Sequence, residues 1–281
     1  MKIRTFSIVG RSADGTQLGV AVASKFLAVG SVVPAAQVGA GALATQAMGN
    51  MQLRTRGLEL LAKGTPAADM LEQFFANDSL KKQRQAGVVD AEGRAATFTG
   101  SDCMPWAGGR AEQHPSGSFA AQGNMLAGPE VLDAMADSWI KNKNLPLTER
   151  LVVALAAGQD AGGDPRGKQA AAVLVVGKNQ GYGGLSDVAV DLRVDDSPAP
   201  INELQRMLKL HDLYFGSTPE ASLLPLTGDL QAEVTQLLAK AGFATGKTTT
   251  DLYNWMGREN YEERWHDSKI DPVVLEQLRN V

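Results

Sequence analysis

The sequence predicts an α+β fold: two antiparallel sheets with a layer of helices outside each, followed by a small all-helical domain. The first observation is the order of the elements, in which blocks of strands alternate with blocks of helices. The second is a shift in composition near Pro198-Ala199-Pro200, after which the chain is almost wholly of helical pattern. The third is size, because 281 residues with 44% hydrophobic and 21% charged residues suffice for one large packed domain and a small one.

The chain opens with strands. Residues 5–10 and 17–28 are apolar and Val-rich and flank the turn Asp14-Gly15, which predicts a hairpin. Residues 30–34 and 39–47 are further strand candidates, and the second is rich in small residues, as expected where backbones approach closely.

Helices and a second hairpin follow. The apolar spacing of residues 54–75 fits two helices separated at Gly64-Thr65-Pro66, with Thr65 as the N-cap. Residues 85–89 and 94–99 form a hairpin. The glycine-rich residues 100–128 are expected to be irregular.

The second helical layer and the last strands complete the large domain. Residues 129–139 and 146–157 have helical periodicity, and residues 170–176 and 188–194 read as strands. We place the large domain at residues 1–207 and the small helical domain at residues 208–281. Helices within or next to the small domain are expected at residues 201–211, 228–241, 248–256 and 272–281.

Charge, cysteine content and hydropathy exclude several classes of protein. A net charge of −4 and a pI near 5.5 provide no field that would collect nucleic acid or anionic lipid. The single Cys103 excludes an intrachain disulfide, and no stretch approaches 18 uninterrupted apolar residues. We therefore expect a cytoplasmic protein that binds neither nucleic acid nor membrane.

The inventory of reactive side chains narrows the chemistry. The three histidines have no zinc-ligand spacing, and no Gly-x-Ser-x-Gly nucleophile elbow occurs, so we expect neither a metal nor a cofactor. A hydrolase built without histidine can use an N-terminal Thr, Ser or Cys whose own α-amine is the base. An α-amine with a pKa of about 8 is partly neutral at cellular pH and can accept the proton of the nucleophile's hydroxyl or thiol.

A series of short motifs between residue 5 and about residue 207 resembles the domain of unknown function 1028 family, whose fold is similar to that of N-terminal-nucleophile (Ntn) hydrolases. The motifs are Thr5-Phe6-Ser7-Ile8-Val9, Leu18-Gly19-Val20-Ala21-Val22-Ala23-Ser24-Lys25-Phe26, Val29-Gly30-Ser31-Val32-Val33-Pro34, Ala44-Thr45-Gln46-Ala47, Gly87-Val88-Val89-Asp90, Phe98-Thr99-Gly100-Ser101, Pro105-Trp106-Ala107-Gly108, Gln122-Gly123-Asn124, Ala161-Gly162-Gly163-Asp164-Pro165-Arg166-Gly167-Lys168-Gln169-Ala170-Ala171 and Val190-Asp191-Leu192-Arg193-Val194-Asp195-Asp196.

The resemblance implies a four-layer αββα Ntn-hydrolase-like sandwich and hydrolysis of an amide-type bond, with no settled substrate. By that analogy Thr5 is the nucleophile. Residues 1–4 precede it here, so catalysis requires their removal to free the Thr5 amine. The alternative is that Thr5 is only a β-branched strand residue.

Further site residues are expected from this mechanism. Lys25 and Asn124 would stabilise developing charge. Several polar residues would bind the substrate, and among them Arg166 would form two hydrogen bonds to a substrate carboxylate. The alternative is that Arg166 and Asp164 form a purely structural ion pair. The other expected substrate-binding residues are Thr45, Gln46 and Gln122.

The tail from Leu204 to Val281 resembles a peptidoglycan-binding-type helical domain attached to some members of this family. Its aromatic residues Tyr253, Trp255, Tyr261 and Trp265 could stack on sugars, although aromatics at helical spacing usually form a core.

The leading hypothesis for the whole chain is an Ntn-type hydrolase of a small amide or ureido substrate. The alternative is a catalytically silent protein that binds a ligand or partner, with a tail used for assembly or glycan recognition. The size and edge-rich fold class suggest a homodimer.

Overall fold

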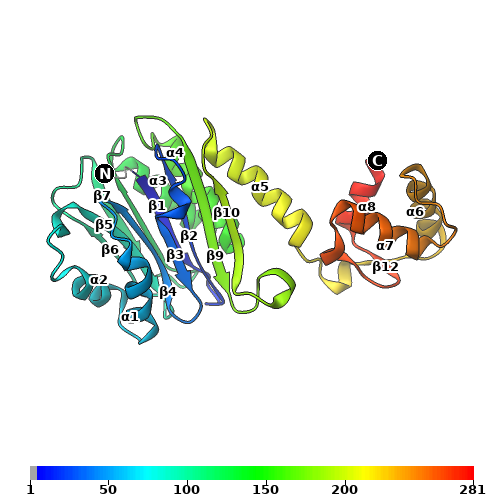
Figure 1. Ribbon diagram of the computed structural model, residues 1–281, viewed down its shortest axis with the longest axis horizontal. Coiled ribbons are helices and arrows are strands. Elements are labelled where there is room, and N and C mark those ends of the chain that lie inside the picture. The colour runs from blue at the N-terminus through cyan, green and yellow to red at the C-terminus, as the bar shows by residue number, and fades with distance from the viewer. Residues whose placement is uncertain (1–4) are drawn as a thin grey trace. The chain divides into compact units, whose positions relative to one another are not determined.

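The computed structural model describes residues 5–281, and the chain folds into two compact units, Met1–Arg206 and Met207–Val281. The first unit contains two antiparallel sheets (Figure 1). One sheet has the strand order β10-β9-β2-β1-β8-β7 and the other has the order β3-β4-β5-β6. The strands are β1 (Thr5–Arg11), β2 (Gln17–Ser24), β3 (Pro34–Gln37), β4 (Gly41–Ala47), β5 (Arg84–Asp90), β6 (Ala95–Thr99), β7 (Ala107–Glu112), β8 (Phe119–Asn124), β9 (Ala170–Gly177) and β10 (Val188–Val194).

The two sheets face each other, and helices cover their outer sides. Strand β1 packs against β4, β2 against β3, and β5 against β8. Helices α3 (Glu130–Lys141) and α4 (Leu147–Asp160) cover the six-stranded sheet, while α1 (Leu58–Ala62) and α2 (Ala67–Phe75) cover the four-stranded one (Figure 1). The predicted α+β architecture, with antiparallel sheets between helical layers, is confirmed.

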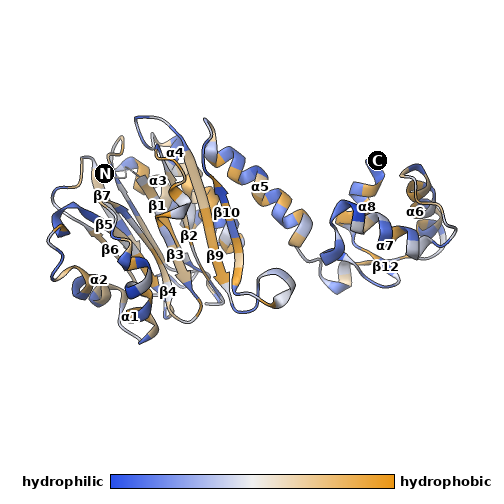
Figure 2. Ribbon diagram, viewed as in Figure 1, coloured by the Kyte–Doolittle hydropathy of each residue, from blue (hydrophilic) through white to orange (hydrophobic). Residues whose placement is uncertain are grey.

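Burial of apolar side chains stabilises each interface between layers. Small and β-branched residues such as Val9, Val20, Ala44 and Val89 fill much of the space between the sheets. Larger side chains, including Phe75, lie between the four-stranded sheet and its helices. Hydrophobic residues are correspondingly continuous along β9, which is buried on both faces (Figure 2).

Trp139 and Arg150 fasten α3 to α4. The indole of Trp139 is fully buried, its Nε1 donates to the Gly117 carbonyl over 3.1 Å, and the Arg150 guanidinium lies 3.9 Å from the ring centre. Arg150 Nε also donates to the Trp139 carbonyl over 2.8 Å. Burial lowers the pKa of Arg150 to about 10, which leaves the guanidinium charged at neutral pH.

Residues 30–34 are not the strand that the sequence predicted. The chain forms a 3-10 turn at Val29–Ser31, and β3 begins only at Pro34. Ala28 adopts a left-handed conformation with φ of 53°, which reverses the chain before the turn. Gly30 permits the close approach, because a Cβ there would lie 2.5 Å from the Cβ of Ala172.

The prediction of irregular structure across residues 100–128 was also wrong. Strands β7 and β8 lie there, and β8 pairs with β1 near the centre of the six-stranded sheet. The sequence of β8, Phe-Ala-Ala-Gln-Gly-Asn, has no β-branched residue. Its strand conformation is imposed by pairing on both sides and by burial rather than by local propensity.

Thr65 does not cap the second helix. Helix α2 begins at Ala67, after Pro66 in an extended conformation, and no side chain of the preceding residue caps it. The carboxylate of Asp90, from strand β5, accepts the Ala67 N–H over 3.1 Å. A long-range contact therefore satisfies a donor that the sequence assigned to a local cap.

The second unit is mostly helical, as predicted. Helix α5 (Pro200–Phe215) spans the boundary between the units, and α6 (Gly228–Lys240), α7 (Thr248–Glu259) and α8 (Pro272–Arg279) surround a core that includes Trp255 and Leu278. A two-residue ladder between β11 (Leu224–Pro225) and β12 (Lys269–Ile270) was not foreseen. Across residues 5–281, no helix combines the length and apolarity needed to cross a membrane.

Candidate functional site

One end of the space between the sheets is polar. The inward-facing positions there carry hydroxyl or carboxamide side chains where the rest of this interface is aliphatic. They come from four strands, β1, β4, β5 and β8, and all are almost fully buried. These residues, which we call the amide cluster, are Ser7, Gln46, Gln85, Gln122 and Asn124.

Thr5 lies at the edge of the amide cluster. It is fully buried at the start of β1, directly opposite Ser24 of β2 in the sheet register. Its Oγ1 donates to Ser24 Oγ over 3.1 Å, and its carbonyl accepts from Gln46 Nε2 over 3.2 Å. The structure thus places the predicted nucleophile against the cluster.

Gln46 and Gln85 connect the two sheets. They pair across β4 and β5, and Gln46 Nε2 donates to Gln85 Oε1 over 2.9 Å. Gln46 Oε1 accepts from Ser7 Oγ over 2.6 Å, which links it to the other sheet. Gln85 Oε1 also accepts from Asn124 Nδ2 over 2.9 Å, so Gln85 holds two members of the cluster at once.

Gln122 is held by β1 and packs against a glycine. Its Nε2 donates to Ser7 Oγ over 2.6 Å and to the Ser7 carbonyl over 3.2 Å. Its Oε1 is buried and has no hydrogen-bond partner among the described residues. Across the interface this amide lies against the Cα of Gly87, where a side chain could not fit.

Gly87→Ala is expected to destabilise the first unit by about 1–3 kcal/mol, because the new Cβ would lie 1.7 Å from Gln122 Oε1 and must displace the amide. Calorimetric unfolding of the full chain measures the change. Gly257→Ala in α7 is the control, because no described atom other than its chain neighbours and the backbone of its own helix lies within 4 Å of its Cβ position, and alanine favours a helix. Equal melting temperatures for the first unit in wild type and Gly87→Ala would contradict the prediction.

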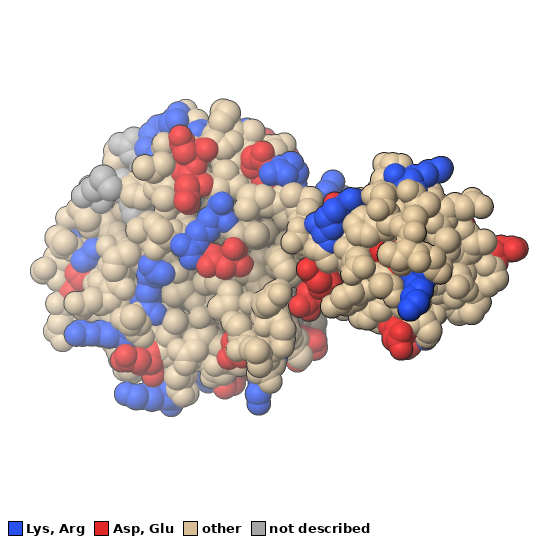
Figure 3. Space-filling view, turned by 45° about the vertical axis from the view of Figure 1, so that its right-hand side comes forward, with Lys and Arg blue, Asp and Glu red and all other residues tan. Residues whose placement is uncertain are grey.

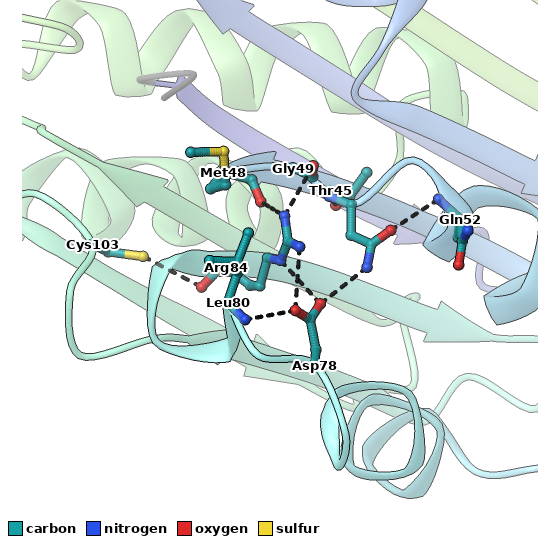
Figure 4. A network of polar contacts seen from close by, with 9 residues as sticks. Thr45, Met48, Gly49, Gln52, Asp78, Leu80, Arg84 and Cys103 are labelled. Carbon is teal, nitrogen blue, oxygen red and sulfur yellow. Dashed lines mark hydrogen bonds and ion pairs between the residues drawn. The ribbon is translucent and has the colours of Figure 1, made fainter. Parts of the chain in front are cut away.

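An ion pair fixes the end of β4 beside the cluster (Figure 4). Arg84 Nε donates to Asp78 over 3.0 Å, and its Nη1 donates to the carbonyls of Met48 and Gly49 over 2.5 and 3.2 Å. Asn50 Nδ2 also donates to Asp78, over 3.0 Å. Burial alone would raise the pKa of Asp78, but these donors and the Leu80 N–H hold it below its ordinary value.

Thr45 belongs to this supporting structure rather than to the amide cluster. It precedes Gln46 on β4, so its side chain points to the opposite face of the strand. Its Oγ1 accepts the backbone N–H of Asn50 over 3.0 Å. The Arg84–Asp78 pair and Thr45 together hold the segment that follows Gln46.

Asp164 and Arg166 form a paired loop near Thr5. Asp164 is buried and accepts from Arg166 Nε over 3.0 Å, from Arg166 Nη2 over 2.5 Å and from the Lys25 N–H over 3.3 Å. A cavity of about 60 Å³ is lined by Asp164 and Ser24, among others. Ser24 thus connects this cavity to Thr5.

Lys25 does not reach the amide cluster. Its side chain is exposed, and its Nζ donates to the Lys168 carbonyl over 3.3 Å. Of the residues expected at the site, Thr5, Gln46, Gln122 and Asn124 come together. Asp164 lines the small cavity next to Ser24, and Arg166 is paired with Asp164.

Three site residues were missed by the sequence analysis: Ser7, Ser24 and Gln85. Their signal is a polar residue at an inward position of an otherwise apolar strand, as Gln85 is within Gln85-Ala86-Gly87-Val88-Val89.

Within residues 5–281, no group of His, Cys, Asp and Glu side chains is arranged to hold a metal ion. Acidic and basic side chains are interspersed on the surface in view, without a continuous basic patch (Figure 3).

The fold and the site define an α+β sandwich with a buried amide cluster at one end. Residues 5–204 match the family model described as "Family of unknown function (DUF1028)", so the chain belongs to this family. Residues 214–278 match the model described as "Putative peptidoglycan binding domain". Both resemblances inferred from the sequence are confirmed.

A solved structure supports the assignment. The chain is similar to a DUF1028 protein from Silicibacter pomeroyi known from a crystal structure, with 29% sequence identity and a TM-score of 0.66. The similarity covers 81% of this chain and 88% of that one. No curated protein matches the chain.

Proposed function

We propose that the protein is an Ntn-type hydrolase that cleaves a small amide or ureido substrate, with Thr5 as the nucleophile after residues 1–4 are removed. The observation that carries the proposal is the position of Thr5, which begins a central strand at the polar end between the sheets and contacts Ser24 and Gln46. Loss of the four residues before Thr5 would give this hydroxyl an adjacent α-amine.

The freed α-amine would accept the proton of Thr5 Oγ1 as the oxygen attacks the carbonyl carbon of the substrate. The C–N bond then breaks, the leaving nitrogen takes that proton, and water hydrolyses the acyl-enzyme. Asn124 would stabilise the oxyanion, because its amide nitrogen carries a second N–H besides the one donated to Gln85. Arg166 would orient an anionic substrate group, with the Nε–Nη2 edge of its guanidinium already fixed by Asp164.

Three versions of the chain test this mechanism: the full-length chain, a chain that begins at Thr5, and a Thr5→Ala version of the second. Each is assayed for release of ammonia or amine from a panel of primary amides, N-acyl amino acids and ureido compounds. We expect turnover by the chain that begins at Thr5 and a loss of roughly a thousandfold or more in Thr5→Ala.

Thr5→Ser in the same truncated chain is the matched control, because it retains the hydroxyl and should keep measurable turnover. The mechanism would be excluded if a homogeneous preparation with the mass of the full-length chain were as active as the chain that begins at Thr5. Full activity in Thr5→Ala would also exclude it.

A silent ligand- or partner-binding protein is the second candidate. The observation in its favour is that the members of the amide cluster mostly bond to one another, as a structural polar core would. In that case none of the three versions would turn over any substrate.

The C-terminal unit is proposed to serve assembly or glycan recognition. Trp255 and Tyr261 are buried in its core, whereas Tyr253 is exposed and contacts Trp265 edge to face at 5.2 Å between ring centres. Trp265 is half-buried against the core, so the exposed ring of Tyr253 is the surface on which a sugar would stack. Pull-down of the full chain with purified peptidoglycan distinguishes glycan recognition from assembly.

A further inference from the structure

Strand β10 is an open edge of the six-stranded sheet. Among the described residues, β9 is the strand that pairs with it, and its other side carries no partner strand. The second sheet ends at β3, which packs over β2 and β9, and the 3-10 turn before β3 lies beside Arg193 of β10, so β3 does not cover the outer edge of β10. Unpaired N–H and C=O groups along such an edge are a template for another strand.

The hairpin that leads into β10 is unusually apolar for an exposed segment. Leu185 is 94% exposed, Tyr182 74% and Val188 44%. Side chains of this kind gathered at one tip are typical of an interaction site. Beyond the other end of β10, Pro198 and Ala199 are also exposed.

The charges on β10 are complementary to a second copy of the same strand. Asp191 and Arg193 lie two residues apart on one face of β10 and form an exposed ion pair of 2.7 Å. If two β10 strands pair antiparallel about a two-fold axis at Leu192, each Asp191 faces the Arg193 of the other copy. Charges on an edge strand often prevent pairing, but here they would attract across both contacts.

The same register also brings the apolar segments together. Antiparallel pairing of β10 (Val188–Val194) sets the start of one strand beside the end of the other, so the apolar hairpin tip that precedes β10 in one copy would lie near Pro198 and Ala199 of the other. One axis thus matches both the charges and the exposed apolar residues of the two copies.

We propose that β10 is a homodimer interface, in which two chains pair their β10 edges into one continuous sheet. The proposal does not depend on the hydrolase mechanism, because the amide cluster lies on other strands. The partner is a second copy of this chain.

Sedimentation velocity of the full-length protein in the micromolar range tests the proposal, together with the variants Asp191→Arg, Arg193→Asp and the double exchange of both. We expect the wild type to sediment as a dimer. Each single substitution would place like charges opposite each other at both symmetry-related contacts and raise the dimer dissociation constant about tenfold or more. The double exchange should return the dissociation constant to that of the wild type.

Glu112→Arg is the matched control. It breaks the ion pair with Arg110 (2.7 Å), which has the same spacing on β7, the opposite edge strand, but β7 packs against β6 of the second sheet. Leu185→Asp adds an independent test, because so exposed a side chain is not needed for folding, and it too should weaken the dimer. Circular dichroism verifies that each variant is folded.

A monomeric wild type would overturn the proposal. A dimer that persists in all three variants Asp191→Arg, Arg193→Asp and Leu185→Asp would also overturn it. So would a dimer that only Glu112→Arg dissociates.

Discussion

Replacement of Asp271 by alanine is expected to unfold the C-terminal unit or to leave it barely stable. The side chains of Asp271 and Arg264 are 0% and 2% exposed, and Arg264 Nη1 donates to Asp271 Oδ2 over 2.8 Å. Without this carboxylate, the buried Arg264 charge keeps only a long 3.9 Å contact to the exposed carboxylate of Asp212, and loss of the buried partner costs about 3–5 kcal/mol.

Asp271 has a second role that increases the effect. It is the N-cap of α8, and its Oδ1 accepts the Val273 N–H over 2.8 Å. Loss of such a cap costs about 1 kcal/mol. A unit of this size has a free energy of unfolding near the low end of about 5–15 kcal/mol. The loss of the ion pair and the loss of the cap together approach this entire free energy.

Urea unfolding of the full chain, followed by the fluorescence of tryptophan, measures this change because Trp255 and Trp265 lie in the unit concerned. Glu233→Ala is the control: it removes an ion pair with Arg279 on the surface, 2.7 Å long and screened by water, and should change stability little. Similar unfolding curves for Asp271→Ala and Glu233→Ala would show that the buried pair is not essential.

Patterns of hydrophobicity sufficed to predict the layers of the fold. Regular periodicity located α3 and α4, and strands β9 and β10 were predicted within a residue or two of their bounds. These elements present one apolar face or a continuous apolar run, so the local sequence carries the information needed.

Elements determined by distant contacts could not be predicted in this way. Strand β8 consists mainly of small residues and is held by β1 and β7, and the first turn of α2 is satisfied by Asp90 from β5. For β1 and β8, as for Ala67 and Asp90, the partner lies more than 20 residues away. No local pattern encodes such a contact.

The candidate site was predicted in part for the same reason. Thr5 was chosen from the resemblance to a family, and Gln46, Gln122 and Asn124 were chosen from the mechanism that it implies. The structure shows that these residues share one end of the interface. Gln85 was missed because a glutamine in a hairpin strand is not distinctive until its position between the two sheets is known. Lys25 follows a site residue in the sequence, but its side chain extends to Lys168.

Gln85→Ala is expected to destabilise the first unit by about 3 kcal/mol or more. The Gln85 side chain accepts from Gln46 and Asn124, and its Nε2 donates to the Gly123 carbonyl over 2.7 Å and to the Gly108 carbonyl over 3.1 Å. Each buried polar group left without a partner costs about 1–3 kcal/mol. For a unit of about 200 residues, this corresponds to a fall of on the order of 10 °C in melting temperature.

Gln17→Ala is the matched control, because Gln17 Nε2 donates to Gln180 Oε1 over 2.7 Å at the surface. That change should lie within about 0.5 kcal/mol of wild type. Calorimetry of the two variants side by side measures the difference, and equal melting temperatures would show that the cluster relaxes or admits water without penalty.

Comparison with Thr5→Ala separates the structural role of the cluster from its proposed chemistry. In the full-length chain this change removes the hydroxyl that donates to Ser24 but leaves the Thr5 carbonyl as an acceptor for Gln46, so we expect a smaller loss of stability than in Gln85→Ala. If Thr5 is the nucleophile, the chain that begins at residue 5 loses activity in Thr5→Ala while remaining folded. A Thr5→Ala variant that unfolds as readily as Gln85→Ala would instead mark Thr5 as part of the polar core.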